Sequence, residues 1–123
     1  MHIILYLYNM ANEIPLNKFR LLAYTLGSGN NLIYSSSLDV ASILLSTQIT
    51  NVTSSIQTVS VLIQKSGSAS YITLMNSGSV PPDESLNPLA GKVVLEKYDG
   101  LYMNTPVSGT LHVVLSVLEN AIN

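Results

Sequence analysis

The side chains best suited to acid–base or metal chemistry are few in this chain and lie far apart. The two histidines are His2 and His112, and cysteine is absent. A zinc site needs three or four converging ligands, and neither histidine has a second histidine or a patterned acid near it in the sequence. We therefore expect no metal site and no cofactor. We interpret His112 as a partly buried residue at a seam between strands or subunits.

Acid–base and nucleophilic catalysis also lack a recognisable set of residues. Asp83 and Glu84 are the adjacent acids of the chain, and such pairs can transfer protons or bind calcium. This pair follows two prolines in a predicted loop, so we interpret it as a solvated turn. A serine nucleophile needs a base and an orienting group, and the chain has no Gly-x-Ser-x-Gly motif. The sequence therefore predicts a protein that is not an enzyme.

Tyrosine is the aromatic residue that this chain favours. It has seven tyrosines, one phenylalanine and no tryptophan. Tyrosine packs and forms hydrogen bonds at interfaces, which makes Tyr34, Tyr71 and Tyr102 candidate contact residues. A rim of such tyrosines with Asn and Ser side chains would equally suit a carbohydrate-binding, adhesive surface.

Charged side chains make up 10% of the residues, and the net charge is −2, whereas a typical domain has about 25% charged residues. This charge content gives no electrostatic footprint for nucleic acid or an anionic membrane, so we expect neither as a partner. Ser, Thr and Asn supply the polarity instead. Uncharged hydroxyls and amides suit a protein packed at high local concentration, and they suit an ordinary secreted β domain equally well.

The beginning of the chain differs from the rest. Residues 1–8 are an apolar run, far shorter than the roughly 18 residues of a membrane span and without the features of a signal peptide. Residues 1–13 are predicted to be an N-terminal extension or arm, and residues 14–123 a β-sandwich domain. Met10 is the favoured natural start, with residues 1–9 an upstream extension or an artefact of start assignment.

The remainder has the pattern of short strands separated by turns. Turn-forming residues recur about every 8–12 positions, and no long stretch has a helical period. The strands are expected at residues 19–26, 32–36, 41–52, 56–65, 69–75, 93–95, 101–104 and 110–119. We predict an all-β, single-domain β-sandwich of Greek-key or jelly-roll type with about seven or eight antiparallel strands. The prolines at 81 and 82 mark an edge or a crossing between sheets.

Two local expectations follow from period-two alternation and turn chemistry. The residues of strand 41–52 expected to face inward are Ala41, Ile43, Leu45, Thr47 and Ile49. A hairpin turn at residues 98–100 is expected to join strands 93–95 and 101–104, and the charges around it are expected to be exposed. Those charged residues are Lys92, Glu96, Lys97 and Asp99.

The last strand is apolar on both faces. One face carries Leu111, Val113, Leu115 and Val117, and the other carries His112, Val114, Ser116 and Leu118. A strand that is apolar on both faces is usually buried on both, either by a second sheet or by another subunit. We therefore predict an assembly seam at His112, Val114 and Leu118.

The stretch SLNPLAGKVVLEKYDGLYM, followed by SGTLHVVLSVLEN, resembles small virion structural proteins of tailed bacteriophages, especially marine and cyanobacterial phages. The resemblance covers about residues 14–120 and consists of diffuse packing patterns. It implies a non-enzymatic capsid decoration, neck, tail or fibre-associated protein. The expected partners are other virion proteins and further copies of the chain, as a trimer or larger homo-oligomer. The expected location is the virion, after production in the host bacterial cytoplasm.

Overall fold

The computed structural model describes residues 16–37 and 40–121. His2, the start at Met10 and the arm predicted over residues 1–13 lie outside the described residues. All regular elements within the described ranges are strands. Their bounds are β1 (Leu16–Thr25), β2 (Asn31–Ser35), β3 (Val40–Asn51), β4 (Gln57–Gln64), β5 (Tyr71–Val80), β6 (Ser85–Leu86), β7 (Val93–Leu95), β8 (Gly100–Asn104) and β9 (Leu111–Ala121).

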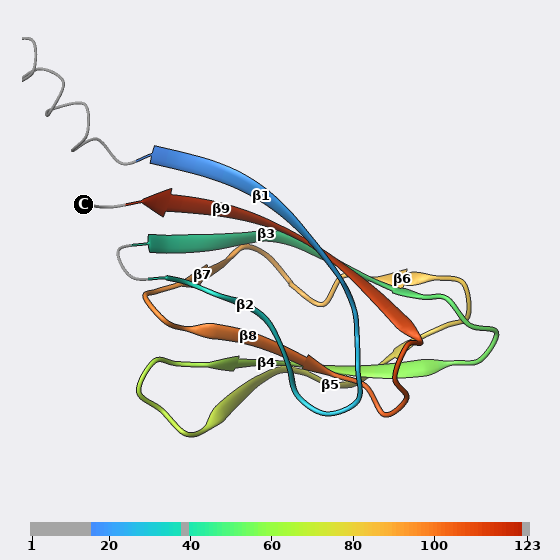
Figure 1. Ribbon diagram of the computed structural model, residues 1–123. Helices are drawn as coiled ribbons and strands as arrows, with labels where there is room; N and C mark the ends of the chain where they lie inside the picture. Colours follow the sequence, from blue (N-terminus) through green and yellow to red (C-terminus); the bar gives the residue numbers. More distant parts are fainter. Residues whose placement is uncertain (1–15, 38–39, 122–123) are drawn as a thin grey trace, which may run out of the picture.

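The strands form two antiparallel sheets, which lie as two layers in Figure 1. The five-stranded sheet has the order β1-β9-β3-β6, and β7 also pairs with β3. The four-stranded sheet has the order β2-β8-β4-β5. The predicted all-β sandwich is therefore confirmed. The described residues contain nine strands, against the seven or eight expected. The additional strand is the two-residue β6, which the sequence pattern does not indicate.

Most connections carry the chain from one sheet to the other. The loop with Pro81 and Pro82 joins β5 of the four-stranded sheet to β6 of the five-stranded sheet, which confirms the predicted crossing. The hairpin predicted at residues 98–100 is wrong, because β7 pairs with β3 whereas β8 pairs with β2 and β4. Tyr98 has a φ of 64° in this turn, and the chain here also passes between the sheets.

The core lies between the two sheets and is centred on β9. The side chains on the inner face of β9 are fully buried, as predicted: Leu111, Val113, Leu115 and Val117. Burial of each such side chain contributes about 1.5–3 kcal/mol relative to exposure. The four-stranded sheet contributes buried side chains from β4 and β8, namely Val59, Val61, Leu101 and Met103. These two sets hold the layers together.

A β-bulge in β3 reverses the inward and outward residues of the first half of that strand. The pairing of β3 with β9 shifts register between Leu44 and Ser46, which inserts one extra residue and displaces the alternation by one. Ser42 and Leu44 are buried, so Ala41 and Ile43, which alternate with them, belong to the outer face. The prediction that Ala41 and Ile43 face the core is wrong. After the bulge, Ile49 is buried as predicted.

Candidate assembly surfaces

The outer face of the five-stranded sheet, called the β9 face here, is formed by side chains that point away from the core. It comprises every second residue from Asn17 to Thr25 in β1 and from His112 to Asn120 in β9, with their partners in β3 and Val94 in β7. These residues alternate with the buried ones on each strand. The second sheet of this chain covers the opposite, inner side.

An apolar row crosses the β9 face from strand to strand. Phe19 pairs with Leu118, Leu118 with Ile43, and Ile43 with Val94. Directly opposed side chains on one face of a sheet lie within contact distance, so the row is continuous across four strands. Phe19 and Val94 are 74% and 62% exposed, and Leu21, beside Phe19, is 70% exposed. Both ends of the apolar row are therefore exposed to solvent.

The residues of the predicted assembly seam, His112, Val114 and Leu118, all belong to the β9 face. His112 and Val114 are exposed, and Leu118 is half-buried. Within the described residues, no second sheet of this chain lies on their side. Of the two predicted covers, a second sheet is therefore not found. Coverage by another subunit remains a prediction.

Sequence alternation points to β9 alone and gives no hint of Phe19, Leu21 or Val94. In β1, Phe19 and Leu21 alternate with Lys18 and Arg20, and the usual interpretation would turn the two charges to solvent. In the structure the charged pair is on the inner side, because Lys18 pairs with Glu119 and Arg20 with buried Val117. This is possible because β1 is an edge strand, where an inward charge still reaches water.

The β9 face carries no Asp, Glu, Lys or Arg among the residues that define it. The charged residues of β1 and β9 lie on the other side, where Arg20 Nη1 is 3.2 Å from Glu119 Oε2. The other charged residues of the described chain lie outside the strands. A sheet face of this size without a single formal charge is unusual for a solvent-exposed surface.

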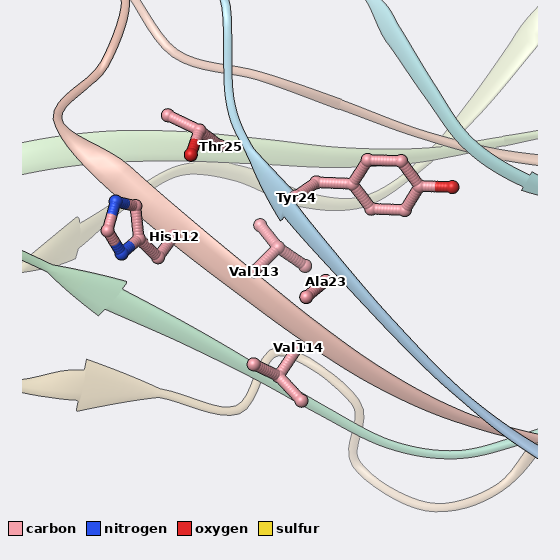
Figure 2. A pocket seen from close by; sticks show the side chains of 6 residues that line it. All are labelled: Ala23, Tyr24, Thr25, His112, Val113 and Val114. Atoms are coloured by element: carbon pink, nitrogen blue, oxygen red, sulfur yellow. The ribbon is translucent and has the colours of Figure 1, made fainter.

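A hollow of about 250 Å³ lies on the β9 face over the paired ends of β1 and β9 (Figure 2). Its lining includes four residues of the β9 face, Ala23, Thr25, His112 and Val114, together with Tyr24 and Val113. Figure 2 shows the imidazole of His112 beside Thr25, and the Tyr24 ring turned away from both. The hollow is therefore bordered by small apolar groups with one imidazole and one hydroxyl.

The outer face of the four-stranded sheet, called the β8 face here, also has an apolar centre. It comprises Leu32 and Ser35 of β2, alternate residues of β8 from Gly100 to Asn104, and their partners in β4 and β5. Leu32 pairs with Tyr102, and Tyr102 pairs with Leu62. None of the residues that define this face is formally charged.

Two of the candidate contact tyrosines meet on the β8 face. The rings of Tyr71 and Tyr102 lie edge to face, with centroids 5.1 Å apart and planes at 85°, a favourable aromatic arrangement. Gly100 makes room for them, because a Cβ at that position would lie 2.9 Å from Tyr102 Cε1 and 3.3 Å from Leu32 Cδ1. Tyr71 is 38% exposed and Tyr102 is half-buried, so this aromatic pair is partly accessible on the β8 face.

The third candidate, Tyr34, is not a surface residue. It is 6% exposed, and its hydroxyl donates a hydrogen bond to Glu119 and lies 2.7 Å from Ser42 Oγ. Burial, followed by the hydrogen bond to Glu119, raises the pKa of Tyr34 to about 12. The proposal of Tyr34 as a contact residue is wrong, because a bulge between Leu32 and Tyr34 turns both Ile33 and Tyr34 to the interior. Tyr34 instead links the two sheets.

Asp99 is also buried, contrary to the exposed turn predicted around it. Its carboxylate accepts hydrogen bonds from Lys65 Nζ at 2.6 Å and from the backbone amides of Ser66 and Glu96, both at 2.9 Å. Burial raises the pKa of Asp99, but the bonds from Lys65 and the two amides outweigh it and hold the pKa below its usual value. This cluster ties the end of β4 to the turn before β8.

The remaining candidate residues do not form a reactive site. Asp83 and Glu84 are exposed in the loop between β5 and β6, as predicted for a solvated turn. Within residues 16–37 and 40–121, no group of three or more His, Asp or Glu side chains is placed to hold a metal ion. In the same ranges, no helix is long and apolar enough to cross a membrane.

Comparison with known proteins gives a likeness of fold. No family model and no curated protein matches this sequence. A chain from the Bacillus endospore appendages, which form a novel family of disulfide-linked pili, superposes with a TM-score of 0.54 at 9% identity, over 89% of this chain and 90% of that one. A chain from the Gt strain of infectious bursal disease virus gives a TM-score of 0.44 at 9% identity, over 89% of this chain and 33% of that one. At such identities the likeness to the appendage chain shows the fold alone.

Proposed function

We propose that this protein is a non-enzymatic structural component of a multi-copy assembly and acts through protein–protein contacts. The observation that carries the proposal is the β9 face, which exposes Phe19, Leu21 and Val94 on a surface without formal charge. Contiguous exposed apolar surface with this character marks an interaction site in a folded protein. The predicted seam residues Val114 and Leu118 belong to the same surface.

The proposed assembly is the virion of a tailed bacteriophage, in which the protein would be a capsid decoration, neck, tail or fibre-associated component. The resemblance of about residues 14–120 to small phage virion proteins supports this setting. The protein would be made in the host bacterial cytoplasm, and its partners would be other virion proteins and further copies of itself. The fold is shared with a chain of the Bacillus endospore appendages, which are pili, and this agrees with use of the architecture in a repeating assembly.

Size-exclusion chromatography with light scattering tests self-association of the full chain over a range of concentrations. We expect species of three or more copies that dissociate on dilution. Sedimentation with particles of the parent phage, followed by electron microscopy, tests incorporation. A chain that stays monomeric at high concentration and does not bind such particles would contradict the proposal.

The pair of exposed Tyr71 and half-buried Tyr102 favours one second function, binding of a host-surface carbohydrate. Aromatic rings pack on the apolar faces of sugars, and the neighbouring Gln64 and Thr73 offer an amide and a hydroxyl for hydrogen bonds. A glycan array probed with the wild-type chain and with Tyr71→Ala tests this function. Tyr98→Ala is the matched control, because Tyr98 is 51% exposed and lies in a turn away from both faces. Binding that is absent, or that Tyr71→Ala leaves unchanged, would rule this site out.

A further inference from the structure

We infer that copies of this chain associate head to tail, with the β8 face of one copy docked on the β9 face of the next. The inference rests on the proposed assembly function and specifies its contact. Both faces are apolar at the centre and free of formal charge, so two copies meet there without repulsion and without desolvating an ion. They lie on opposite sides of the two-layer sandwich (Figure 1). A contact between opposite faces leaves a free face at each end and repeats.

The shapes of the two faces favour this contact over a symmetric one. The β8 face presents a partly exposed aromatic pair, Tyr71 and Tyr102, whereas the β9 face presents the hollow bordered by Ala23, His112 and Val114. The hollow of about 250 Å³ is open to solvent and bordered by His112 and Thr25. A tyrosine ring of the next copy would lie in it, with the imidazole and the Thr25 hydroxyl as hydrogen-bond partners for its hydroxyl.

The area available suits a weak, reversible interface. Four strands about 4.8 Å apart, with five to ten residues each of about 3.3 Å, give roughly 450 Å² of sheet on the smaller face. Two such surfaces bury about 900 Å² together, which is in the range of weak, transient contacts. A second copy thus matches both the size and the chemistry of the surface it would cover.

Two variants that each block one face provide the test. Leu21→Glu places a charge on the β9 face and Leu32→Glu places one on the β8 face, at positions 70% and 52% exposed. Ile56→Glu and Val107→Glu are matched controls, because these side chains are 65% and 52% exposed in loops outside both faces. Circular dichroism and thermal melting establish that each variant is folded, and Val94→Glu, at a position 62% exposed, replaces Leu21→Glu if that variant unfolds.

Light scattering of each variant alone and of their mixture separates the possible geometries. We expect the wild type and both controls to associate, and each blocked variant to be monomeric. The 1:1 mixture should form a dimer, because the intact β9 face of the Leu32→Glu chain meets the intact β8 face of the Leu21→Glu chain. Tyr71→Ala should weaken wild-type association about tenfold or more, as expected for an aromatic anchor seated in a pocket of the partner, whereas Tyr98→Ala should not.

Other outcomes overturn the inference and identify what failed. If either blocked variant dimerises alone, or if the mixture stays monomeric, the contact is not between opposite faces, although the proposed assembly function stands. If both blocked variants associate like the wild type, the contact lies elsewhere in the chain. If the wild type itself is monomeric at every concentration and does not bind phage particles, the proposed function fails together with the inference.

Discussion

Replacement of Leu115 by alanine should strongly destabilise the fold, whereas Val114→Ala, one residue earlier, should not. Leu115 is fully buried at the centre of β9, where it pairs with Leu22 of β1 and Thr47 of β3. Truncation of a buried leucine removes its transfer free energy and leaves a cavity, at a cost of about 2–5 kcal/mol. Val114 is 39% exposed on the opposite side of the same strand, so its truncation opens no enclosed cavity and should cost less than about 1 kcal/mol.

The assay is urea unfolding followed by circular dichroism at one fixed protein concentration, because self-association adds to apparent stability. A loss of about 3 kcal/mol with a slope near 2 kcal/mol per molar lowers the midpoint by about 1.5 M. It also lowers the melting temperature by roughly 10–20 °C for a domain of this size. Equal effects of Leu115→Ala and Val114→Ala, or a midpoint unchanged in Leu115→Ala, would refute the assignment of the two faces of β9.

Three further predictions address the polar interactions of the core and the β8 face. Tyr34→Phe should lower the free energy of unfolding by about 1–3 kcal/mol in urea titrations, because it leaves buried hydrogen-bond partners unsatisfied. The control Tyr98→Phe should have little effect. In an ultraviolet titration of the wild type, one phenol should ionise only near pH 12. The pKa of Asp99 is lower in the folded than in the unfolded state, so its contribution to stability is present above its unfolded pKa of about 3.9 and is lost as pH falls below that value. Melting temperatures measured between pH 7 and pH 2 should therefore fall less steeply for Asp99→Asn than for the wild type, and an identical slope would contradict the role of the Lys65 cluster. Gly100→Ala should change near-ultraviolet circular dichroism of the tyrosines, because the new methyl group displaces the Tyr102 ring; an unaltered tyrosine spectrum would mean that the ring does not lie over Gly100.

The strands themselves were accessible to sequence reasoning, because period-two alternation and turn residues are local signals. The alternation of Leu111, Val113 and Leu115 places these side chains in the core, and the structure buries all three. The same signal fails at Ala41 and Ile43, because a bulge changes the alternation without changing the composition of the strand. It fails again at the turn 98–100, where strand pairing depends on distant segments that the local sequence does not identify.

The β9 face was likewise predictable only in part from the sequence. The sequence identified Val114 and Leu118 as part of a second apolar face on a core strand, which it predicted to be covered by a second sheet or another subunit. It could not indicate that Phe19 and Val94 extend this surface, because their strands are far apart in the sequence and are joined only through the order of strands in the sheet.

 Along the chain, the apolar row runs from Phe19 to Leu118, back to Ile43 and forward to Val94, so its members become neighbours only in the folded sheet.

The sequence by itself determined that this protein is built from strands, that it offers few groups for catalysis, and that its last strand has two apolar faces. These properties depend on residue type and local spacing. The tertiary structure decided which apolar side chains stay exposed, that Tyr34 and Asp99 are buried among polar partners, and that the two outer faces carry no formal charge. Those properties depend on strand order, register and the bulges in β2 and β3, which arise from contacts between residues far apart in the chain.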